Sequence, residues 1–118
     1  MPSWPVSRKE KFMYARQVSI ELNPNSRSEF IQKLDSEILP ILRKQKGFKD
    51  EITFVSPDHK VAFAVSLWDS KESAEAYDKA SFADVTKILS KLIQGSPRVK
   101  TFEVAHSTFH SIAAKKAA

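Results

Sequence analysis

Arg16 has an unusual position for a charged residue and is one candidate for a functional site. The side chains of residues 14–22 alternate between two sets, which is the period of a β-strand, and Arg16 falls in phase with the apolar Val18 and Ile20. A guanidinium group is a fixed positive charge, and a charge on an apolar strand face requires a partner. Two interpretations fit equally well: an ion pair with Glu103 on a later strand, or a site in which Arg16 holds an anionic ligand.

Two aromatic residues, Trp68 and Tyr77, are further candidates. Trp68 ends the apolar run that starts at Val61, where an indole ring is as often a packing residue as part of a site. Tyr77 falls on the apolar stripe of a predicted helix. This position favours a core role, with the hydroxyl group at the rim, over a role in a site.

The sequence contains no motif typical of a metal site or of a catalytic nucleophile. There is no cysteine, which excludes disulfides, thiolate chemistry and cysteine-ligated metals. His106 and His110 would lie on one face of a strand about 13 Å apart, too far to chelate one metal ion. The serine, histidine and acidic residues form no nucleophile-elbow motif, and two glycines form no phosphate loop. We therefore expect neither a metal nor another cofactor.

The elements that position these residues follow from periodicity and capping signals. A strand is expected over 14–22, and Ser26 and Glu29 then have the spacing of a capping box at a helix start. Apolar residues continue at helical spacing. Pro40 falls within this helix and removes one backbone hydrogen bond, so we expect a kink there. Gly47 is predicted to end the helix in the left-handed conformation.

The second half of the chain is predicted to form a β-hairpin, then a second helix, then a last strand. Its strands are expected over residues 51–56, 61–68 and 99–109. Asp69 or Ser70 caps the second helix, and the apolar phase of that helix slips near Ser81-Phe82, which predicts a break. The segment from Gly95 to Pro97 is predicted to stop this helix before the last strand.

The resulting order predicts an α+β, ferredoxin-like fold: a βαββαβ chain with an antiparallel sheet and two helices on one face. We expect one domain over residues 12–110, between a flexible arm at 1–11 and a flexible tail at 111–118. The helices leave one sheet face bare, although apolar residues occur on both faces of strands three and four. We therefore predict a homodimer in which two sheets pack face to face.

The net charge of +5 does not indicate a nucleic-acid partner. Much of it belongs to the chain ends, at Arg8, Lys9, Lys11, Lys115 and Lys116. The basic segment 43–49 lies at an expected helix C-terminus, where cations complement the helix dipole, and aromatic residues are not interleaved with its bases as a stacking platform requires. No apolar run is long enough to cross a bilayer, and the first residues lack a signal-peptide layout. We expect a cytoplasmic protein with no nucleic-acid or membrane partner.

The chain resembles the antibiotic-biosynthesis-monooxygenase-like family of dimeric α/β barrels over about residues 12–110. The resemblance rests on Ile38-Leu-Pro-Ile-Leu-Arg43 running to Gly47-Phe48, and on Ser66-Leu-Trp-Asp-Ser70 leading into Glu72-Ser-Ala-Glu-Ala-Tyr77. The family includes cofactor-free oxygenases of aromatic polyketides, haem-degrading enzymes and many members of unassigned role. The resemblance implies a site between the sheet and the helices of each subunit.

The haem-degrading branch of the family is not matched. That branch uses an asparagine on strand one, a tryptophan ending strand three and a histidine on helix two. Only Trp68 corresponds, because strand one carries Arg16 and Gln17, and helix two has Tyr77 and Asp78 near the histidine position. Haem iron would lack its axial ligand, so we expect no haem.

The cofactor-free branch is similar in more respects. Its chemistry requires a phenolic substrate deprotonated to an electron-rich anion and polar donors that stabilise charge on oxygen. The resemblance implies that Trp68 supplies a ring wall and an indole donor, Arg16 a fixed positive charge, and Tyr77 and Gln17 hydrogen bonds to a quinone or phenolate oxygen. None of these is an obvious general base.

The expected function is therefore that of a cofactor-independent monooxygenase-like protein that acts on, or binds, a small aromatic molecule of phenol or quinone type. The alternative is a non-enzymatic protein of the same dimeric fold that binds a small ligand or simply assembles. A third interpretation is a stress-related accessory protein whose basic arm contacts a partner.

Overall fold

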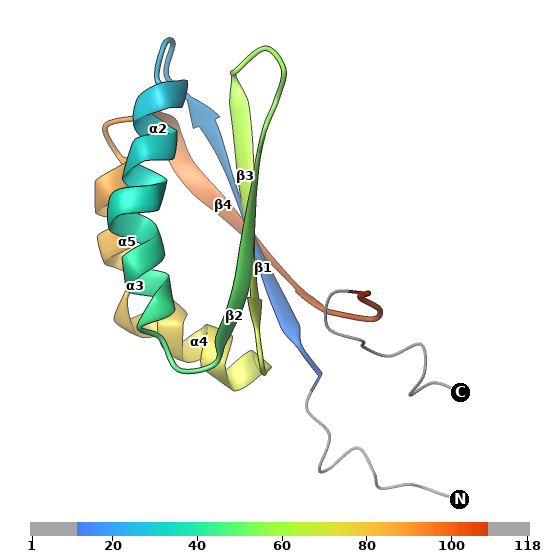
Figure 1. The fold of residues 1–118 in the computed structure, drawn as a ribbon. Helices are drawn as coiled ribbons and strands as arrows, with labels where there is room; N and C mark the ends of the chain where they lie inside the picture. The colour runs from blue at the N-terminus through green and yellow to red at the C-terminus, as the bar shows by residue number, and fades with distance from the viewer. Residues whose placement is uncertain (1–11, 109–118) are drawn as a thin grey trace, which may run out of the picture.

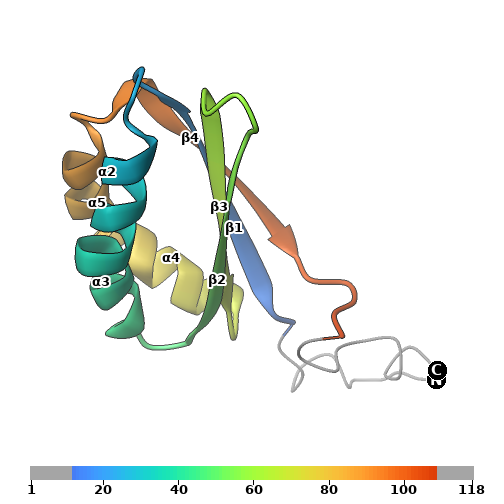
Figure 2. The same cartoon turned by 45° about the horizontal axis from the view of Figure 1, so that its top comes forward.

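A four-stranded antiparallel sheet forms one layer of the protein in the computed structural model, which describes residues 12–108. The strands are β1 (Tyr14–Leu22), β2 (Phe48–Val55), β3 (Val61–Trp68) and β4 (Ile93–Glu103). Their spatial order is β2-β3-β1-β4, so β1 and β3 are central and β2 and β4 form the edges. All helices lie on one side of this sheet (Figures 1 and 2). The ferredoxin-like α+β fold predicted from the sequence is confirmed.

The first helical stretch consists of α2 (Arg27–Lys33), the π-helical turn η1 (Leu34–Ile38) and α3 (Leu39–Arg43). The predicted distortion near Pro40 takes the form of this wide turn, in which the N–H of Leu39 donates to the carbonyl of Leu34. Pro40 has no N–H and its ring displaces the carbonyl four residues back, which favours the longer hydrogen-bond spacing.

The capping box predicted at the start of this helix is not formed. Ser26 is the residue before α2, but its side chain makes no capping hydrogen bond. Its carbonyl still accepts the first intrahelical bond, from the backbone N–H of Phe30 at 2.8 Å. At the far end of the stretch, Gly47 has φ +87°, as predicted, but it does not end the helix: α3 ends at Arg43 with Lys44 as its C-cap, and Gly47 directly precedes β2. A side chain at Gly47 would collide with Ser73 and Asp69, so the glycine also allows close packing there.

The second helical stretch consists of α4 (Lys71–Ala80) and α5 (Phe82–Leu89), separated by the predicted break at Ser81. Of the two candidate capping residues, Ser70 takes the role, because its hydroxyl oxygen accepts from the backbone N–H of Ser73 at 3.2 Å. The helix ends at Leu89 rather than at Gly95, and the chain turns directly into β4.

The bounds predicted for the last strand are wrong at both ends. β4 begins at Ile93 rather than Val99, and it ends at Glu103 rather than near Phe109, which lies outside the described residues. Ser19 pairs with Arg98 and Glu21 with Gln94, so the segment from Gly95 to Pro97 bulges out of the register. An edge strand tolerates this glycine and proline, which a helix or a central strand would not.

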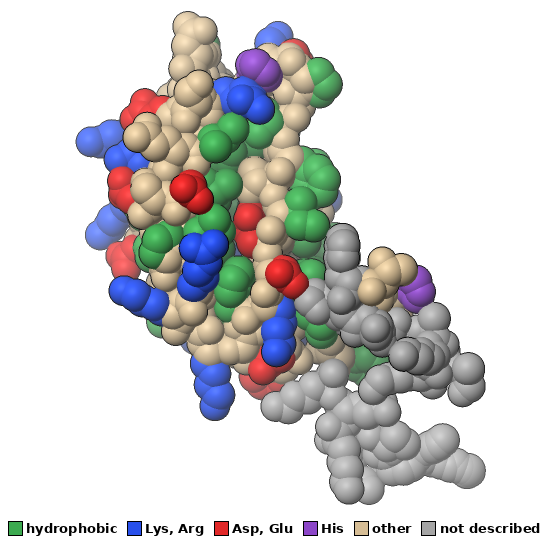
Figure 3. Space-filling model, viewed as in Figure 1, with side chains coloured by type: hydrophobic (Ala, Val, Ile, Leu, Met, Phe, Trp, Pro, Cys, Tyr) green, Lys and Arg blue, Asp and Glu red, His purple; other side chains and the backbone are tan. Residues whose placement is uncertain are grey.

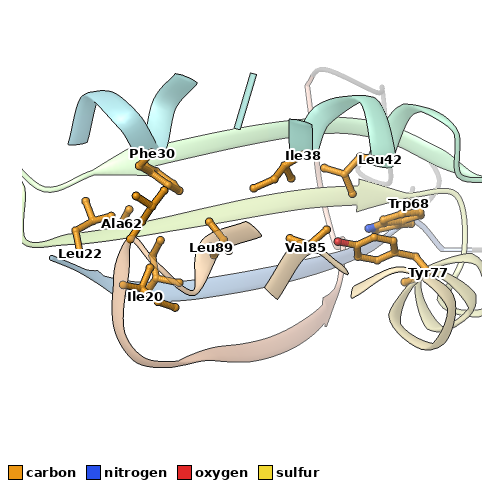
Figure 4. Close-up of a cluster of buried hydrophobic side chains, with 13 residues drawn as sticks. Ile20, Leu22, Phe30, Ile38, Leu42, Ala62, Trp68, Tyr77, Val85 and Leu89 are labelled. Atoms are coloured by element: carbon orange, nitrogen blue, oxygen red, sulfur yellow. The ribbon is translucent and has the colours of Figure 1, made fainter. Parts of the chain in front are cut away.

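The core lies between the helices and the sheet face that they cover. Its buried side chains include Ile20, Leu22, Phe30, Ile38, Leu42, Ala62, Trp68, Tyr77, Val85 and Leu89. Figure 4 shows the stacked rings of Trp68 and Tyr77 at one end of this cluster and Leu22 at the other. Within residues 12–108, no helix is long and apolar enough to cross a membrane.

Candidate functional site

A narrow cavity lies between the helix-covered sheet face and the helices. Apolar side chains from β1, α2, η1, α3 and α5 form most of its wall, including Ile20, Phe30, Leu34, Ile38, Val85 and Leu89. The volume of the cavity is about 50 Å³. This volume corresponds to a few water molecules. A planar ligand would therefore have to part side chains of the helical layer from the sheet.

Apolar side chains also reach the surface near this cavity. Figure 3 shows hydrophobic and acidic side chains exposed along the junction of the helical layer with the sheet. The π-helical turn η1 contributes Leu34 and Ile38 to the cavity wall. A π-turn is an irregular segment that is often found at functional sites.

Arg16 is buried at the edge of this cavity, with 3% of its surface exposed. Its Nη1 donates to Oδ1 of Asp78 on α4 at 2.9 Å. The guanidinium carbon lies 4.6 Å from the ring centroid of Phe82 and 5.3 Å from that of Tyr77. The other two nitrogens, Nε and Nη2, are buried and have no hydrogen-bond partner among residues 12–108. Arg16 is therefore held in place through Nη1, while Nε and Nη2 could donate hydrogen bonds to a ligand.

The ion pair proposed between Arg16 and Glu103 is wrong. In the β1–β4 register Arg16 lies opposite Thr101, whereas Glu103 lies opposite Tyr14 and is exposed. Glu103 thus shares the sheet face of Arg16 but is displaced along the strand by about 7 Å. The carboxylate that reaches Arg16 comes instead from Asp78 on the helix above.

Tyr77 lies beside Arg16 and is buried, with 4% of its surface exposed. Its ring stacks on that of Trp68 at a centroid distance of 5.0 Å and meets Phe82 edge-on at 6.2 Å. Burial raises the pKa of Tyr77 to about 12, although the charge of Arg16 opposes this shift. Tyr77 is therefore a neutral phenol near pH 7, able to donate a hydrogen bond but not to act as a base.

Trp68 is fully buried and lies behind Tyr77 rather than in the cavity wall (Figure 4). Its indole N–H donates to the hydroxyl of Ser66 at 2.9 Å, and its ring meets Phe48 edge-on at 5.5 Å. The donor that the sequence suggested for a ligand is thus used internally. Trp68 contributes to the site by holding Tyr77 in place.

Gln17 is separated from the other candidates by the pleat of β1. It neighbours Arg16 in sequence, so its side chain points to the opposite face of the sheet, and it does not line the cavity. Its strand partners are Val65 on β3 and Lys100 on β4. The structure therefore brings together Arg16 and Tyr77, places Trp68 behind them, and leaves Gln17 on the bare face.

Glu51 is a cavity residue that sequence reasoning missed. It lies on β2 opposite Ser66, which in turn lies opposite Arg16, and its side chain lines the same cavity. Burial raises the pKa of this carboxyl group, and a hydrogen bond from the Thr53 hydroxyl partly opposes the rise. The alternation along β2 sets Glu51 apart from the apolar Ile52. This alternation shows that Glu51 and Ile52 lie on opposite faces of the sheet. It does not show which of the two faces the helices cover.

The remaining titratable residues do not build a metal centre in the described part of the chain. Within residues 12–108, no group of three or more histidine, cysteine and acidic residues is arranged to hold a metal ion. His106 is exposed beyond the end of β4, and His110 lies outside the described residues.

Comparison with known proteins defines the fold. No protein-family profile and no curated protein matches the sequence. A monooxygenase from the ActVA-Orf6 gene of Streptomyces coelicolor, solved with the ligand Nanaomycin D, is similar with a TM-score of 0.70 and 16% identity. The match covers 81% of this chain and 90% of that chain.

Two further solved structures support the same conclusion. A candidate antibiotic biosynthesis monooxygenase from Bordetella bronchiseptica matches with a TM-score of 0.68 and 15% identity, over 80% of this chain and 98% of that one. A conserved protein of unknown function from Bacteroides thetaiotaomicron matches with a TM-score of 0.65 and 23% identity, over 80% and 99%. These similarities show that the chain has the fold of the antibiotic biosynthesis monooxygenases.

Proposed function

We propose that this protein binds a small aromatic molecule of phenol or quinone type between its sheet and helices, and acts on it as a monooxygenase that needs no metal or flavin. The observation that carries the proposal is the state of Arg16. Two of its nitrogens are buried at the edge of an apolar cavity without a partner in the described part of the chain. Each buried donor without a partner costs about 1–3 kcal/mol, which an oxygen atom of a bound ligand would recover.

The surroundings of Arg16 favour an aromatic ligand. Phe82 and Tyr77 lie against the guanidinium group, and the rest of the wall is almost entirely apolar. A flat ring with an electron-rich oxygen would bury its faces against these side chains and accept a charge-assisted hydrogen bond from Arg16. The Tyr77 hydroxyl, neutral near pH 7, would be a second donor toward such an oxygen.

The fold supports the class of reaction. The monooxygenase from Streptomyces coelicolor has the same fold and was solved with an organic ligand. A fixed cation and a neutral phenol donor are the kind of group that stabilises negative charge as it develops on a substrate oxygen. The transfer of this activity to the present chain is our proposal, since a shared fold alone does not specify a reaction.

We further propose that the protein is a homodimer formed through the bare sheet face. Apolar side chains exposed on that face include Ile52, Phe54, Val61 and Phe102. Phe54 and Phe63 stack there with ring centroids 4.8 Å apart. A cluster of large apolar side chains open to solvent is typical of an interaction surface, and two copies related by a twofold axis would cover it.

The second candidate is a non-enzymatic protein of the same fold that binds a small ligand or only assembles. The narrowness of the cavity favours it, because about 50 Å³ of water-accessible space is small for a substrate site. Assembly through the sheet face needs no cavity at all. Ligand binding followed by oxygen consumption distinguishes the two candidates.

The test begins from a Trp4→Phe protein, so that Trp68 is the one remaining tryptophan. Phenols and quinones should quench its fluorescence saturably, and Arg16→Gln should weaken an anionic ligand about 10- to 100-fold, as expected for a lost charge-assisted hydrogen bond. Arg27→Gln is the matched control, because Arg27 is an exposed arginine on α2, away from both the cavity and the bare sheet face. Oxygen uptake with a bound phenol supports the enzyme. Binding without uptake supports the second candidate, and no binding refutes the proposed site.

A further inference from the structure

Three polar residues form a row across the helix-covered face of the sheet. Glu51 on β2 is paired with Ser66 on β3, and Ser66 is paired with Arg16 on β1. Adjacent strands lie about 4.8 Å apart, so the backbones at Glu51 and Arg16 are about 10 Å apart. Both side chains line the same cavity. A carboxylate and a guanidinium group therefore approach one apolar space from two sides.

Among the residues that the structure describes, no other charged group lines the cavity between them. The titratable lining residues are Arg16, Glu51 and Tyr77, while α2, η1, α3 and α5 contribute only apolar side chains. Within residues 12–108, Glu51 forms no ion pair, and its hydrogen-bond partner is the Thr53 hydroxyl. The carboxylate is thus partly removed from water without a cation to neutralise it, which makes it a better proton acceptor.

We propose that Glu51 accepts the proton of a ligand hydroxyl group, and that the cavity therefore selects aromatic ligands with a hydroxyl at one end and an oxygen acceptor at the other. In this step the ligand O–H bond breaks and an Oε–H bond forms on Glu51. The negative charge passes from the carboxylate to the ligand oxygen. Conjugation through the ring carries part of that charge to the oxygen held by Arg16. No oxidant takes part.

This inference rests on the proposed function, because it requires an aromatic ligand in the cavity. It supplies the general base that Arg16, Tyr77 and Trp68 do not provide. A carboxylate with a raised pKa is suited to this role, since proton transfer is most efficient when the pKa of the base approaches the working pH. The competing explanation is that Glu51 is an inward-pointing charge that protects the edge strand β2 from pairing with another sheet.

The probe for this step is 4-nitrophenol, whose phenolate absorbs visible light and whose neutral form does not. Its hydroxyl group would face Glu51 and its nitro group would face Arg16. The full chain is titrated at a pH at which most of the free probe is neutral. The bound probe should show the phenolate band. With Glu51→Gln the probe should still bind but remain neutral, and the control Glu103→Gln should behave as the parent does.

A second ligand separates selectivity from simple burial of a ring. In 4-nitroanisole the hydroxyl proton is replaced by a methyl group, so the parent protein should bind it about 10- to 100-fold more weakly than 4-nitrophenol. This preference should be largely lost in Glu51→Gln. Glutamine keeps the shape of the side chain but cannot take a proton, so the variant is expected to fold.

The possible failures are distinguishable. If neither ligand binds the parent, the proposed function fails and the role of Glu51 with it. If both ligands bind equally and the bound nitrophenol stays neutral, the cavity binds aromatics but Glu51 is only an edge-strand charge. If the phenolate band persists in Glu51→Gln, the charge of Arg16 alone ionises the ligand, and the role assigned to Glu51 is overturned.

Discussion

Arg16 and Asp78 are joined by one hydrogen bond of 2.9 Å, yet the side chain of Arg16 is 4% exposed and that of Asp78 is 48% exposed. The pair is therefore unequal. Water can solvate the carboxylate, so its attraction for the guanidinium group is screened and contributes little to stability. The desolvation of Arg16 is offset only in part, by this bond and by the rings of Tyr77 and Phe82.

The first prediction follows from this imbalance. Arg16→Met replaces a buried charge by an apolar side chain of similar length and leaves Asp78 in contact with water. The midpoint of thermal unfolding should stay the same or rise, because buried ion pairs are often no more stable than apolar replacements. Binding of anionic phenols should be lost in the same variant. A fall of many degrees in the midpoint would show that Arg16 serves stability, and it would count against a site.

The second prediction concerns the pH dependence contributed by Tyr77. Burial raises its pKa from the ordinary 10.0 to about 12 in the folded protein. Between these values the folded state keeps a proton that the unfolded state has lost, so stability falls as the pH rises. The contribution is complete below pH 10 and is lost as the pH rises through about 12. A shift of this size corresponds to about 2–3 kcal/mol in the free energy of unfolding.

The measurement is urea unfolding between pH 9 and pH 12 for the parent and for Tyr77→Phe. The parent should lose more stability over this range than the variant, since phenylalanine has no proton to release. Tyr14→Phe is the matched control, because Tyr14 is only half-buried on β1. Equal slopes for the parent and Tyr77→Phe would contradict the assignment of a strongly raised pKa.

Much of the secondary structure could be predicted because it depends on local signals. The alternation in 61–68 correctly predicted both ends of β3. The phase slip near Ser81 correctly predicted the break between α4 and α5, and Gly47 has the predicted positive φ. In each case the information lies within a few residues, in side-chain period or backbone freedom. The predicted capping box at Ser26 shows the limit, because correct spacing did not produce the bond.

The site was harder to predict because it depends on register and on contacts between distant segments. The partner of Arg16 is 62 positions away on a helix. Pairing with Glu103 would have required a β1–β4 register shifted by two residues from the observed one, in which Arg16 lies opposite Thr101. Glu51 was missed for a similar reason. Its strand alternates clearly, but which face meets the helices is decided by the whole sheet.

The third prediction tests the support behind Tyr77. The hydroxyl of Ser66 accepts the indole N–H of the fully buried Trp68, so Ser66→Ala leaves that donor without a partner. The free energy of unfolding should fall by about 1–3 kcal/mol. Ser90→Ala is the control, because the Ser90 hydroxyl bonds the Lys87 carbonyl at an exposed helix end, and its effect should stay within about 0.5 kcal/mol. Similar losses in both variants would mean that the indole bond carries no special weight.

The last prediction concerns assembly. If the bare sheet face joins two copies, light scattering at micromolar concentration should give twice the chain mass of 13.4 kDa. Phe54→Lys should then shift the protein toward the monomer, because it places a charge among apolar side chains that the partner would bury. Phe54 is 46% exposed in the single chain, so the same change should alter the stability of a monomer only slightly.

Ile31→Lys provides the matched control for this experiment. Ile31 is 39% exposed, but it lies on α2 in the helical layer, away from the bare face. A dimer that survives Ile31→Lys and dissociates with Phe54→Lys assigns the interface to the sheet. If both variants remain dimeric, the copies meet elsewhere. A parent protein that is monomeric at this concentration would falsify the face-to-face dimer, and the exposed side chains around Phe54 would then need another partner to cover them.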